Sequence, residues 1–422
     1  MISRRGFIAT AGASALTTSL PTPLAVARPT GINKLRITGV RTVEVRGVVY
    51  GKGIVLPWDP QKRPRFTRNY VVTQLFTNEG LVGTTMDGDT TLPENTGRIV
   101  QEAAEAYFIG KDPFDIARHN SEFFSKQALR PRKNFLEVAL WDIIGKTCGQ
   151  PLYKLWGAYS DKVPAYAATV HFDKTPTERV EDALRFYEKG FRAIKLRMHD
   201  LNPAVDLKLA QTVIEGVGDK MAVMFDANQA GKKVTDDKSI TPVWDYERTL
   251  FMAKELEAMG IYWLEEPMMR DSLDDLARVR RQLTRMHLAG AEGDVGLERF
   301  RDILTKDSFS YIQPDPMVVG PVSVLRKVAA MAEAFGVLCG PHHGKSGVGM
   351  LASLHLQCAM PNTGHLEYMY DPGYWNPEGF QVGFTEPWPV DDEGYCHAPT
   401  APGLGAPWDR GFFRKHKLEW AG

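Results

Sequence analysis

The first third of the chain shows two kinds of hydrophobic pattern, and each predicts a different kind of element. Residues 34–49 and 70–83 alternate β-branched or aliphatic residues with polar ones, as half-buried strands do. An Asn-Glu-Gly sequence at 78–80 fits a hairpin turn inside the second run. Residues 94–109 and 133–150 have helical patterns instead. Strands followed by helices predict an α+β domain.

From Val163 onward, short apolar runs alternate with longer amphipathic segments. The first amphipathic segment opens with Thr-Pro-Thr-Glu at 175–178, a capping box with proline at the first helical position, and ends at Gly190. Residues 245–259 repeat the helical spacing. Short strands that are apolar on both faces and separated by helices predict a closed parallel barrel. The eight predicted strands are residues 163–170, 192–197, 222–226, 261–265, 287–292, 310–314, 337–341 and 364–368.

Composition narrows the class of protein. With 422 residues, two domains are expected, and the 43% hydrophobic and 24% charged residues are those of a globular protein. Formal charge is zero, which does not favour nucleic acid as a partner. Beyond the N-terminus no run of about 18 apolar residues predicts a membrane span in the mature protein. Four cysteines are few for a disulfide scaffold, so we predict no essential disulfide.

The N-terminus resembles a twin-arginine export signal. Arg4 and Arg5 precede a weakly apolar stretch, and Ala25-Val26-Ala27 has the form of a cleavage site. We therefore expect residues 1–27 to be an export signal that is read by the twin-arginine translocase and cleaved near Ala27. The mature protein is then expected in the periplasm. A disordered basic tail is the alternative interpretation.

Three carboxylates end three successive predicted strands. Asp226, Glu265 and Glu292 close the third, fourth and fifth strands of the barrel, and neighbouring strands lie about 4.8 Å apart. Three buried anions without a cation would be very costly, and oxygen ligands favour Mg2+, with Mn2+ also possible. A single such carboxylate is more often a salt-bridged strand end. Glu266 follows Glu265, and strand alternation predicts that it points away.

Other strand ends carry groups that can move protons. Lys195 and Arg197 lie two residues apart on the second strand and therefore face the same side. Asp315 and His342 end the sixth and seventh strands, and a carboxylate bonded to an imidazole makes a general base. His343 is the competing assignment, because alternation sends only one of the two histidines inward.

A basic segment separates the first two predicted strands. Residues 50–69 are rich in glycine, proline, lysine and arginine and predict a loop. The loop is either solvated or a lid whose cations meet the substrate. Its cations and its tryptophan are Lys52, Lys62, Arg63, Arg65, Arg68 and Trp58.

The ordered set of strand-end residues resembles the enolase superfamily, specifically its mandelate racemase subgroup. That family joins an α+β capping domain to a (β/α)7β barrel, a modified TIM barrel. Its second strand ends in K-x-K or K-x-R, its third to fifth in a D/E/E metal triad, its sixth and seventh in an Asp–His dyad, and its eighth in Glu. The matching residues here are Lys195 and Arg197, then Asp226, Glu265 and Glu292, then Asp315 and His342, and finally Glu367.

The resemblance covers roughly residues 34–410 and implies a domain organisation. We expect a capping domain at 33–155, a catalytic barrel at 160–385 and a tail at 386–422 that completes the capping domain. The export signal and a polar insertion around Gly231 to Pro242 depart from the family pattern. We also expect a homo-oligomer.

The resemblance implies a Mg2+-dependent enzyme that removes the proton α to a carboxylate on a small-molecule substrate. Arg197 stands where family racemases have a second lysine, and a guanidinium cannot serve as a base. We therefore predict dehydration of a sugar acid to a 2-keto-3-deoxy acid, with Glu367 protonated against the substrate carboxylate. A racemase or epimerase using Lys195, a cycloisomerase of lactones or anhydro-sugar acids, and a non-enzymatic binding protein remain alternatives.

Overall fold

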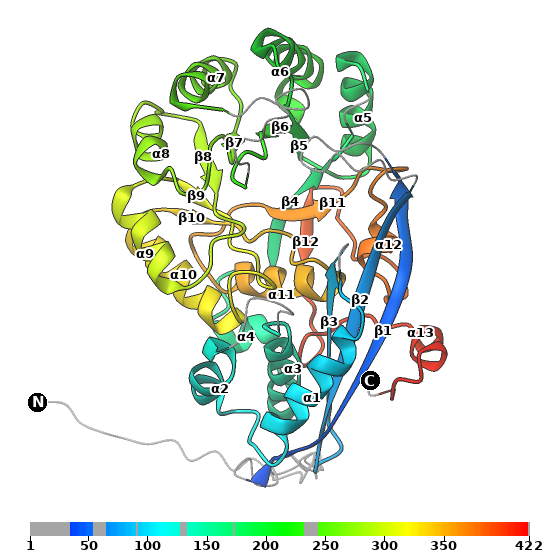
Figure 1. Ribbon diagram of the computed structural model, residues 1–422. Coiled ribbons are helices and arrows are strands. Elements are labelled where there is room, and N and C mark those ends of the chain that lie inside the picture. The colour runs from blue at the N-terminus through cyan, green and yellow to red at the C-terminus, as the bar shows by residue number, and fades with distance from the viewer. Residues whose placement is uncertain are drawn as a thin grey trace, which may run out of the picture. The chain divides into compact units, whose positions relative to one another are not determined.

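The structure is a computed structural model that describes residues 34–53, 65–89, 92–126, 133–171, 174–231 and 244–420. Leu35–Gly422 forms one compact unit, and Figure 1 shows its elements in order along the chain. The predicted export signal, the tip of the predicted lid and most of the polar insertion lie outside the described residues. In the described part, no helix combines the length and apolar character needed to cross a bilayer.

Three antiparallel strands and four helices come first. The strands are β1 (Ile37–Lys52), β2 (Arg65–Thr77) and β3 (Val82–Asp89), paired in that order. β2 and β3 meet at the turn predicted at 78–80. The helices are α1 (Thr96–Phe108), α2 (Ile116–Glu122), α3 (Leu136–Cys148) and α4 (Leu152–Trp156), followed in the chain by the barrel; η2 (Phe124–Lys126) is a short 3-10 helix after α2.

The predicted lid loop was too long at both ends. β1 and β2 continue to pair as far as Gly51 with Phe66 and Lys52 with Arg65. Lys52 and Arg65 are exposed at this end of the sheet, and Arg68 is buried against a turn far along the chain, so a basic composition did not exclude strand here. Lys52, Arg65 and Arg68 therefore belong to strands, whereas Lys62, Arg63 and Trp58 lie outside the described residues.

In the described part of the chain, eight parallel strands then alternate with seven helices, as the sequence predicted; the strand predicted at 222–226 has its predicted bounds, and the other seven are shorter than predicted. The strands are β4 (Lys162–Ala168), β5 (Ala193–Arg197), β6 (Ala222–Asp226), β7 (Trp263–Glu265), β8 (His287–Gly290), β9 (Tyr311–Ile312), β10 (Leu338–Cys339) and β11 (Leu366–Met369). The helices are α5 (Pro176–Glu188), α6 (Pro203–Val217), α7 (Tyr246–Ala258), α8 (Leu273–Arg280), α9 (Leu297–Lys306), α10 (Val322–Ala334) and α11 (Gly347–Cys358), with a 3-10 turn η3 (Gly218–Lys220) after α6.

The strands follow each other in chain order around a curled sheet, with β11 beside β4 (Figure 1). β10 and β11 are the two edges of this sheet and form no strand ladder with each other. A single parallel bridge, between Cys339 on β10 and Thr363 before β11, joins the two edges. The predicted capping box starts α5, where the Thr175 hydroxyl accepts the Glu178 amide and the Glu178 carboxylate accepts the Thr175 amide. The fold is the predicted (β/α)7β arrangement.

The C-terminal segment contacts both parts of this unit. β12 (Tyr395–His397) pairs antiparallel with β4, and the short helices α12 (Pro377–Phe380) and α13 (Arg410–Lys415) flank it in the chain. The Leu404 amide donates to Asp142 Oδ1 on α3 at 2.9 Å. Gln74 on β2 exchanges two hydrogen bonds with the backbone of Glu419.

Aromatic rings fill the barrel interior below the strand ends. Trp263 lies between Tyr166 and Tyr311, with ring centroids 5.1 and 4.9 Å away, and all three side chains are buried. The Lys195 ammonium lies 5.3 Å from the Tyr166 ring centroid. These rings form an apolar floor under the strand-end residues.

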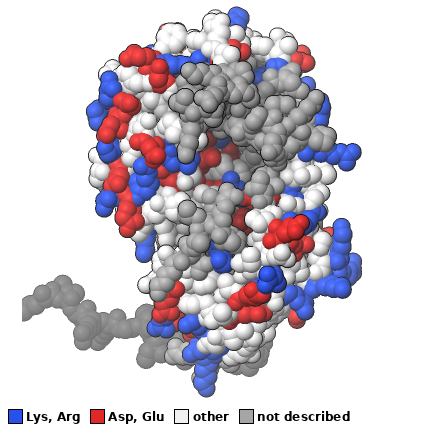
Figure 2. All heavy atoms as spheres, viewed as in Figure 1, with Lys and Arg blue, Asp and Glu red and all other residues white. Residues whose placement is uncertain are grey.

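The surface carries both signs of charge. Figure 2 shows acidic and basic side chains interspersed over the face of the molecule that is in view, in line with the zero net charge. All four cysteines are free.

Candidate active site

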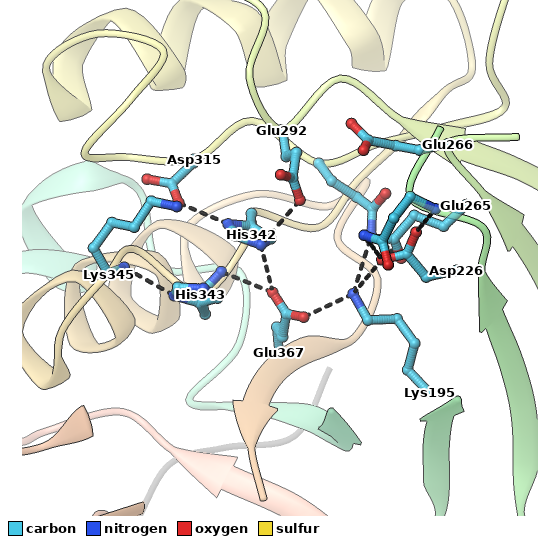
Figure 3. A network of polar contacts seen from close by, with 12 residues as sticks. Lys195, Asp226, Glu265, Glu266, Glu292, Asp315, His342, His343, Lys345 and Glu367 are labelled. Carbon is cyan, nitrogen blue, oxygen red and sulfur yellow. Dashed lines mark hydrogen bonds and ion pairs between the residues drawn. The ribbon is translucent and has the colours of Figure 1, made fainter. Parts of the chain in front are cut away.

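The ionisable residues singled out in the sequence lie at or just beyond the C-terminal ends of the parallel strands (Figure 3). In a parallel barrel these ends share one mouth, so residues far apart in the chain come together. Those within strands are Lys195 and Arg197 on β5, Asp226 on β6, Glu265 on β7 and Glu367 on β11. Glu292, Asp315 and His342 follow β8, β9 and β10 by two to three residues.

Lys195 lies in a cage of carboxylates. Its ammonium is 2.7 Å from Glu367, 2.8 Å from Glu265 and 3.9 Å from Asp226, and all these side chains are 1% exposed. Burial by itself would lower the pKa of Lys195, but Glu265 and Glu367 outweigh burial and raise it. Lys195 is therefore a fixed positive charge in this state.

Arg197 occupies the next inward position of β5 and contacts Asp226 directly. Strand register pairs Arg197 with Asp226, and Asp226 with Glu265, so the three end their strands side by side. The Arg197 guanidinium forms an ion pair with Asp226, donates to the Thr169 carbonyl at 2.9 Å and reaches the Asn228 side-chain oxygen at 3.2 Å. These contacts fix the guanidinium in the wall of the site.

Glu265 and Glu266 face different ways, as predicted, but strand alternation is not the cause, because β7 ends at Glu265 and Glu266 has a φ of 44°. Glu265 accepts hydrogen bonds from Lys195 and, at 2.9 Å, from Gln313. Burial raises the pKa of Glu265 to about 7. Figure 3 shows Glu266 turned away from Lys195, and its carboxylate lies 3.6 Å from Arg270. Burial and the nearby Glu292 raise the pKa of Glu266 well above its usual range.

His342 lies on the opposite wall between three carboxylates. Its Nδ1 is 2.7 Å from Asp315, and its Nε2 is 3.0 Å from Glu292 and 3.5 Å from Glu367. Burial opposes a charged imidazole, yet Glu292 and Glu367 raise the pKa of His342 to about 10. His342 in turn lowers the pKa of Glu292 against the effect of burial. The imidazole is therefore protonated while Glu292 faces it.

His343 does not point away from the site, and the prediction that only one histidine turns inward was wrong. Its ring centroid lies 4.0 Å from that of His342, and both side chains are buried. The alternation rule fails because β10 ends at Cys339, before either histidine. Burial, and then His342, lower the pKa of His343 well below its usual value, so this imidazole is neutral.

Glu367 connects the two walls (Figure 3). One carboxylate oxygen faces Lys195, and the other accepts the His343 amide at 3.0 Å and lies near His342. Burial favours the protonated acid, but Lys195 and His342 lower the pKa of Glu367 to about 2. Glu367 is thus ionised in this state, not protonated as we expected.

The three predicted metal ligands lie next to each other but are each engaged by a protein cation. Arg197 faces Asp226, Lys195 faces Glu265, and His342 faces Glu292. None of these cations lies close in sequence to the carboxylate that it faces. Among the described residues, the only set of three metal-binding side chains with ligand atoms within 4.8 Å of one another is Asp315, His342 and His343.

Several polar residues of the site were missed in the sequence. Gln313 hydrogen-bonds Glu265, and the Asn228 amide and side chain both donate to Asp226. Tyr166 shares a hydrogen bond with Glu367. Gln313 and Asn228 each lie two residues from a predicted site residue, so polar residues beside strand-end acids were an available signal. Tyr166 lay inside a predicted strand and had none.

Comparisons with known proteins agree with this geometry. Residues 178–411 match the family model described as enolase C-terminal domain-like. Residues 55–157 match the mandelate racemase / muconate lactonizing enzyme N-terminal domain. Arabinonate dehydratase of Saccharolobus solfataricus is 29% identical over 286 residues, 67% of this chain and 71% of the relative.

A second relative carries a different reaction in its name. The 3,6-anhydro-alpha-L-galactonate cycloisomerase of Streptomyces coelicolor is 31% identical over 270 residues, 64% of this chain and 67% of the relative. Among solved structures, L-talarate dehydratase from Polaromonas sp. JS666, complexed with Mg and L-glucarate, superposes with a TM-score of 0.76. It is 25% identical and covers 90% of this chain and 97% of its own.

Proposed function

The chain belongs to the mandelate racemase / muconate lactonizing enzyme family of the enolase superfamily, and on this basis we propose that it is a hydro-lyase acting on a sugar acid. The reaction removes the proton α to the carboxylate and eliminates the β-hydroxyl as water. The product is a 2-keto-3-deoxy acid. Relatives named as arabinonate, L-talarate/galactarate and D-xylonate dehydratases support this reaction class.

The observation that carries the proposal is the difference between the two walls of the site. On one wall, Lys195 and Arg197 are both engaged by carboxylates. On the other, His342 is backed by Asp315, and its imidazole can give up its proton once Glu292 no longer faces it. Racemisation needs a competent base on each face of the α carbon, whereas dehydration needs one proton-transfer group that works as base and acid. A single imidazole facing two fixed cations favours dehydration.

A divalent cation fits the residues of this mouth. Asp226, Glu265 and Glu292 come from successive strands, supply only oxygen donors and are backed by further carboxylates, so negative charge is in excess. Burial raises the pKa of Glu265 to about 7, and the negative charges of Asp226 and Glu367 add to the rise. We propose that these three side chains hold Mg2+, which would supply charge neutralisation at the substrate carboxylate. The Mg complex of the Polaromonas relative supports the choice of metal.

The protein residues then divide the proton chemistry. His342 Nε2 removes the α-proton, and Asp315 fixes the ring by accepting its Nδ1–H. The electrons of the broken C–H bond form the ene-diolate, whose negative charge the Lys195 ammonium stabilises. The β C–O bond breaks as His342 returns the proton to the leaving hydroxyl, and the enol then becomes the keto acid. His342 can act as a base only when Glu292 no longer faces it.

His342→Asn tests the proposal, since asparagine has a similar shape but cannot take a proton. The wild type and the variant are incubated with a panel of aldonic and aldaric acids in D2O with Mg2+. We expect the wild type to form a 2-keto-3-deoxy product, and the variant to lose both product formation and deuterium exchange at the α carbon. His397→Asn, on an exposed histidine of β12, is the matched control. Exchange that persists without dehydration would assign α-proton removal to Lys195, and retention of both would exclude His342.

The second candidate function is a cycloisomerase acting on an anhydro-sugar acid or a lactone. The cycloisomerase relative with 31% identity favours it. Such an enzyme uses the same α-proton removal but loses no water, so the product has the mass of the substrate. Mass spectrometry of the products separates the two reactions. A protein that binds these acids without any α-proton exchange would be a binding protein instead.

We further propose that the enzyme is exported by the twin-arginine translocase and works in the periplasm. Arg4, Arg5 and the Ala25–Ala27 segment support this, although they lie outside the described residues. Replacing both arginines with lysine and fractionating the cells tests it. We expect the mature protein to disappear from the periplasm, and an undiminished periplasmic level would refute export by this route.

A further inference from the structure

The turn that follows the two histidines is held in an uncommon backbone conformation. Gly344 and Lys345 have φ of 72° and 64°, and a lysine in this left-handed region is uncommon. Non-glycine residues keep such conformations only where the surrounding structure imposes them, and these sites are often functional. The turn therefore needs contacts that hold it.

The strands of the capping domain supply those contacts. Arg68 on β2 donates from Nη1 to the Lys345 carbonyl at 2.6 Å. The Ser346 hydroxyl donates to the Met86 carbonyl on β3 at 2.9 Å. Gly88 on β3 packs so closely that a Cβ there would lie 2.8 Å from the Lys345 carbonyl oxygen. The adjacent strands β2 and β3 thus both contact the turn at Gly344 and Lys345 in the barrel.

Arg68 itself is well fixed in place. Its residue is 8% exposed, and its guanidinium lies 4.6 Å from the Phe380 ring centroid and 5.7 Å from that of Tyr50. The sequence placed Arg68 in a loop that was either solvated or a lid whose cations meet the substrate. Instead, its planar donor group is directed at a backbone carbonyl of the other domain.

Hydrogen bonds lead from this turn to the proton-transfer residues. The Lys345 amide donates to His343 Nδ1 at 2.9 Å, so the neutral His343 ring must carry its proton on Nε2. The His343 amide donates to Glu367 at 3.0 Å, and the His343 ring lies against His342. Movement of the turn would shift the ring that packs on His342 and the amide that orients Glu367.

We propose that Arg68 is a positioning residue for proton transfer, acting through the Lys345 carbonyl to fix His343 and, through it, His342 and Glu367. The capping domain then sets the geometry of the reacting groups in addition to covering the site. Arg68 touches none of the groups proposed to react. Replacing Arg68 should therefore change kcat and the tautomer of the His343 ring, with little effect on substrate affinity.

Arg68→Met is the main test, because methionine keeps apolar contact with Phe380 and Tyr50 but cannot donate to the carbonyl. We expect kcat to fall by about 100-fold, the order expected for a displacement of about 1 Å, with KM changed by less than about threefold. Arg68→Lys keeps a donor and should recover part of kcat. Arg98→Met removes an exposed arginine on α1 and should behave as wild type.

A spectroscopic measurement separates positioning from loss of stability. In metal-free protein labelled with 15N in its histidine rings, wild-type His343 should show a protonated Nε2 and an unprotonated Nδ1. In Arg68→Met we expect a mixture of the two tautomers, and in Arg68→Lys the wild-type pattern. If Arg68→Met does not fold, Arg68→Gln replaces it, with the same expected losses in smaller degree.

Two results would overturn the proposal. One is an Arg68→Met enzyme with wild-type kcat, or with a loss confined to KM. The other is a loss of kcat with the His343 tautomer unchanged. The rate measurement rests on the proposed dehydratase function, but the tautomer measurement needs no substrate. If the wild type dehydrates no acid, the proposed function fails while the test of Arg68 still stands.

Discussion

Replacing Lys195 with methionine should reveal how strongly the site depends on one buried charge. Methionine is unbranched and of similar length, so the change removes the ammonium with little change in volume. It leaves Glu265, Glu367 and Asp226 without the cation that lies within 3.9 Å of all three. Because these side chains are almost completely buried, water cannot replace the lost partner.

The expected cost follows from the two short contacts, 2.7 and 2.8 Å. At an effective dielectric constant of about 20, unit charges 4 Å apart interact by about 4 kcal/mol. Both contacts are shorter, but burying the ammonium consumed part of that gain. Removing one partner of a buried ion pair costs about 3–5 kcal/mol, and we expect Lys195→Met to lower the free energy of unfolding by that amount without Mg2+.

Urea unfolding at pH 8 in the presence of a chelator measures this cost, from the shift in midpoint at a shared slope. Combining Lys195→Met with Glu367→Gln should cost at least about 1 kcal/mol less than the sum of the single changes, since the pair is then removed together. Arg118→Met breaks an exposed pair with Asp115 and should cost no more than about 1 kcal/mol. A loss below about 1 kcal/mol for Lys195→Met, or additive losses, would refute the reasoning.

Three further predictions concern the metal, turnover and acid stability. Glu292→Gln should weaken Mg2+ binding in calorimetry, whereas Glu266→Gln, on a side chain turned toward Arg270, should leave it within about threefold; equal losses would contradict the ligand assignment. Glu367→Gln should lower kcat far more than it changes KM, and a change confined to KM would reject its role at the transition state. Burial lowers the pKa of His355 from 6.5 to about 4, so the folded state binds this proton less tightly than the unfolded chain. The contribution of His355 to the free energy of unfolding should therefore be fully present above pH 6.5 and be lost, by about 3 kcal/mol, as the pH drops through 4. Urea unfolding at pH 7.5 and 4.5 measures this loss, and His355→Gln should remove the part that His355 causes. A loss of the same size in the variant would exclude His355.

The sequence was most informative where a local pattern determines the outcome. Strand alternation placed Lys195 and Arg197 on one face, and both side chains contact the carboxylates of the site. The capping box at Thr175 and the order of the eight strands were also local signals, and both are present.

The outcome was harder to predict where it depends on contacts distant in the chain. His343 follows the end of β10, so no strand periodicity governs its direction. Arg68 donates to a residue 277 positions away, and nothing near Arg68 in the sequence indicates that partner. The cations that face the three acidic strand ends come from β5 and from the segment after β10, and nothing near these acids in the sequence indicates which cation each one meets.

The contacts of the C-terminal segment have a consequence for when the protein can fold. Gln74 is buried on β2, and its side chain bonds Thr84 on β3 and the backbone of Glu419, 345 positions later. Asp142 on α3 bonds Thr84 and Lys146 through one oxygen, but its Oδ1 accepts the amide of Leu404, 262 positions later. A chain still emerging from the ribosome therefore carries a capping domain in which these two side chains are only partly bonded until Leu404 and Glu419 have been made. Because the barrel strands lie between the two parts of that domain in the chain, we expect the domain to become complete only after the barrel has been synthesised.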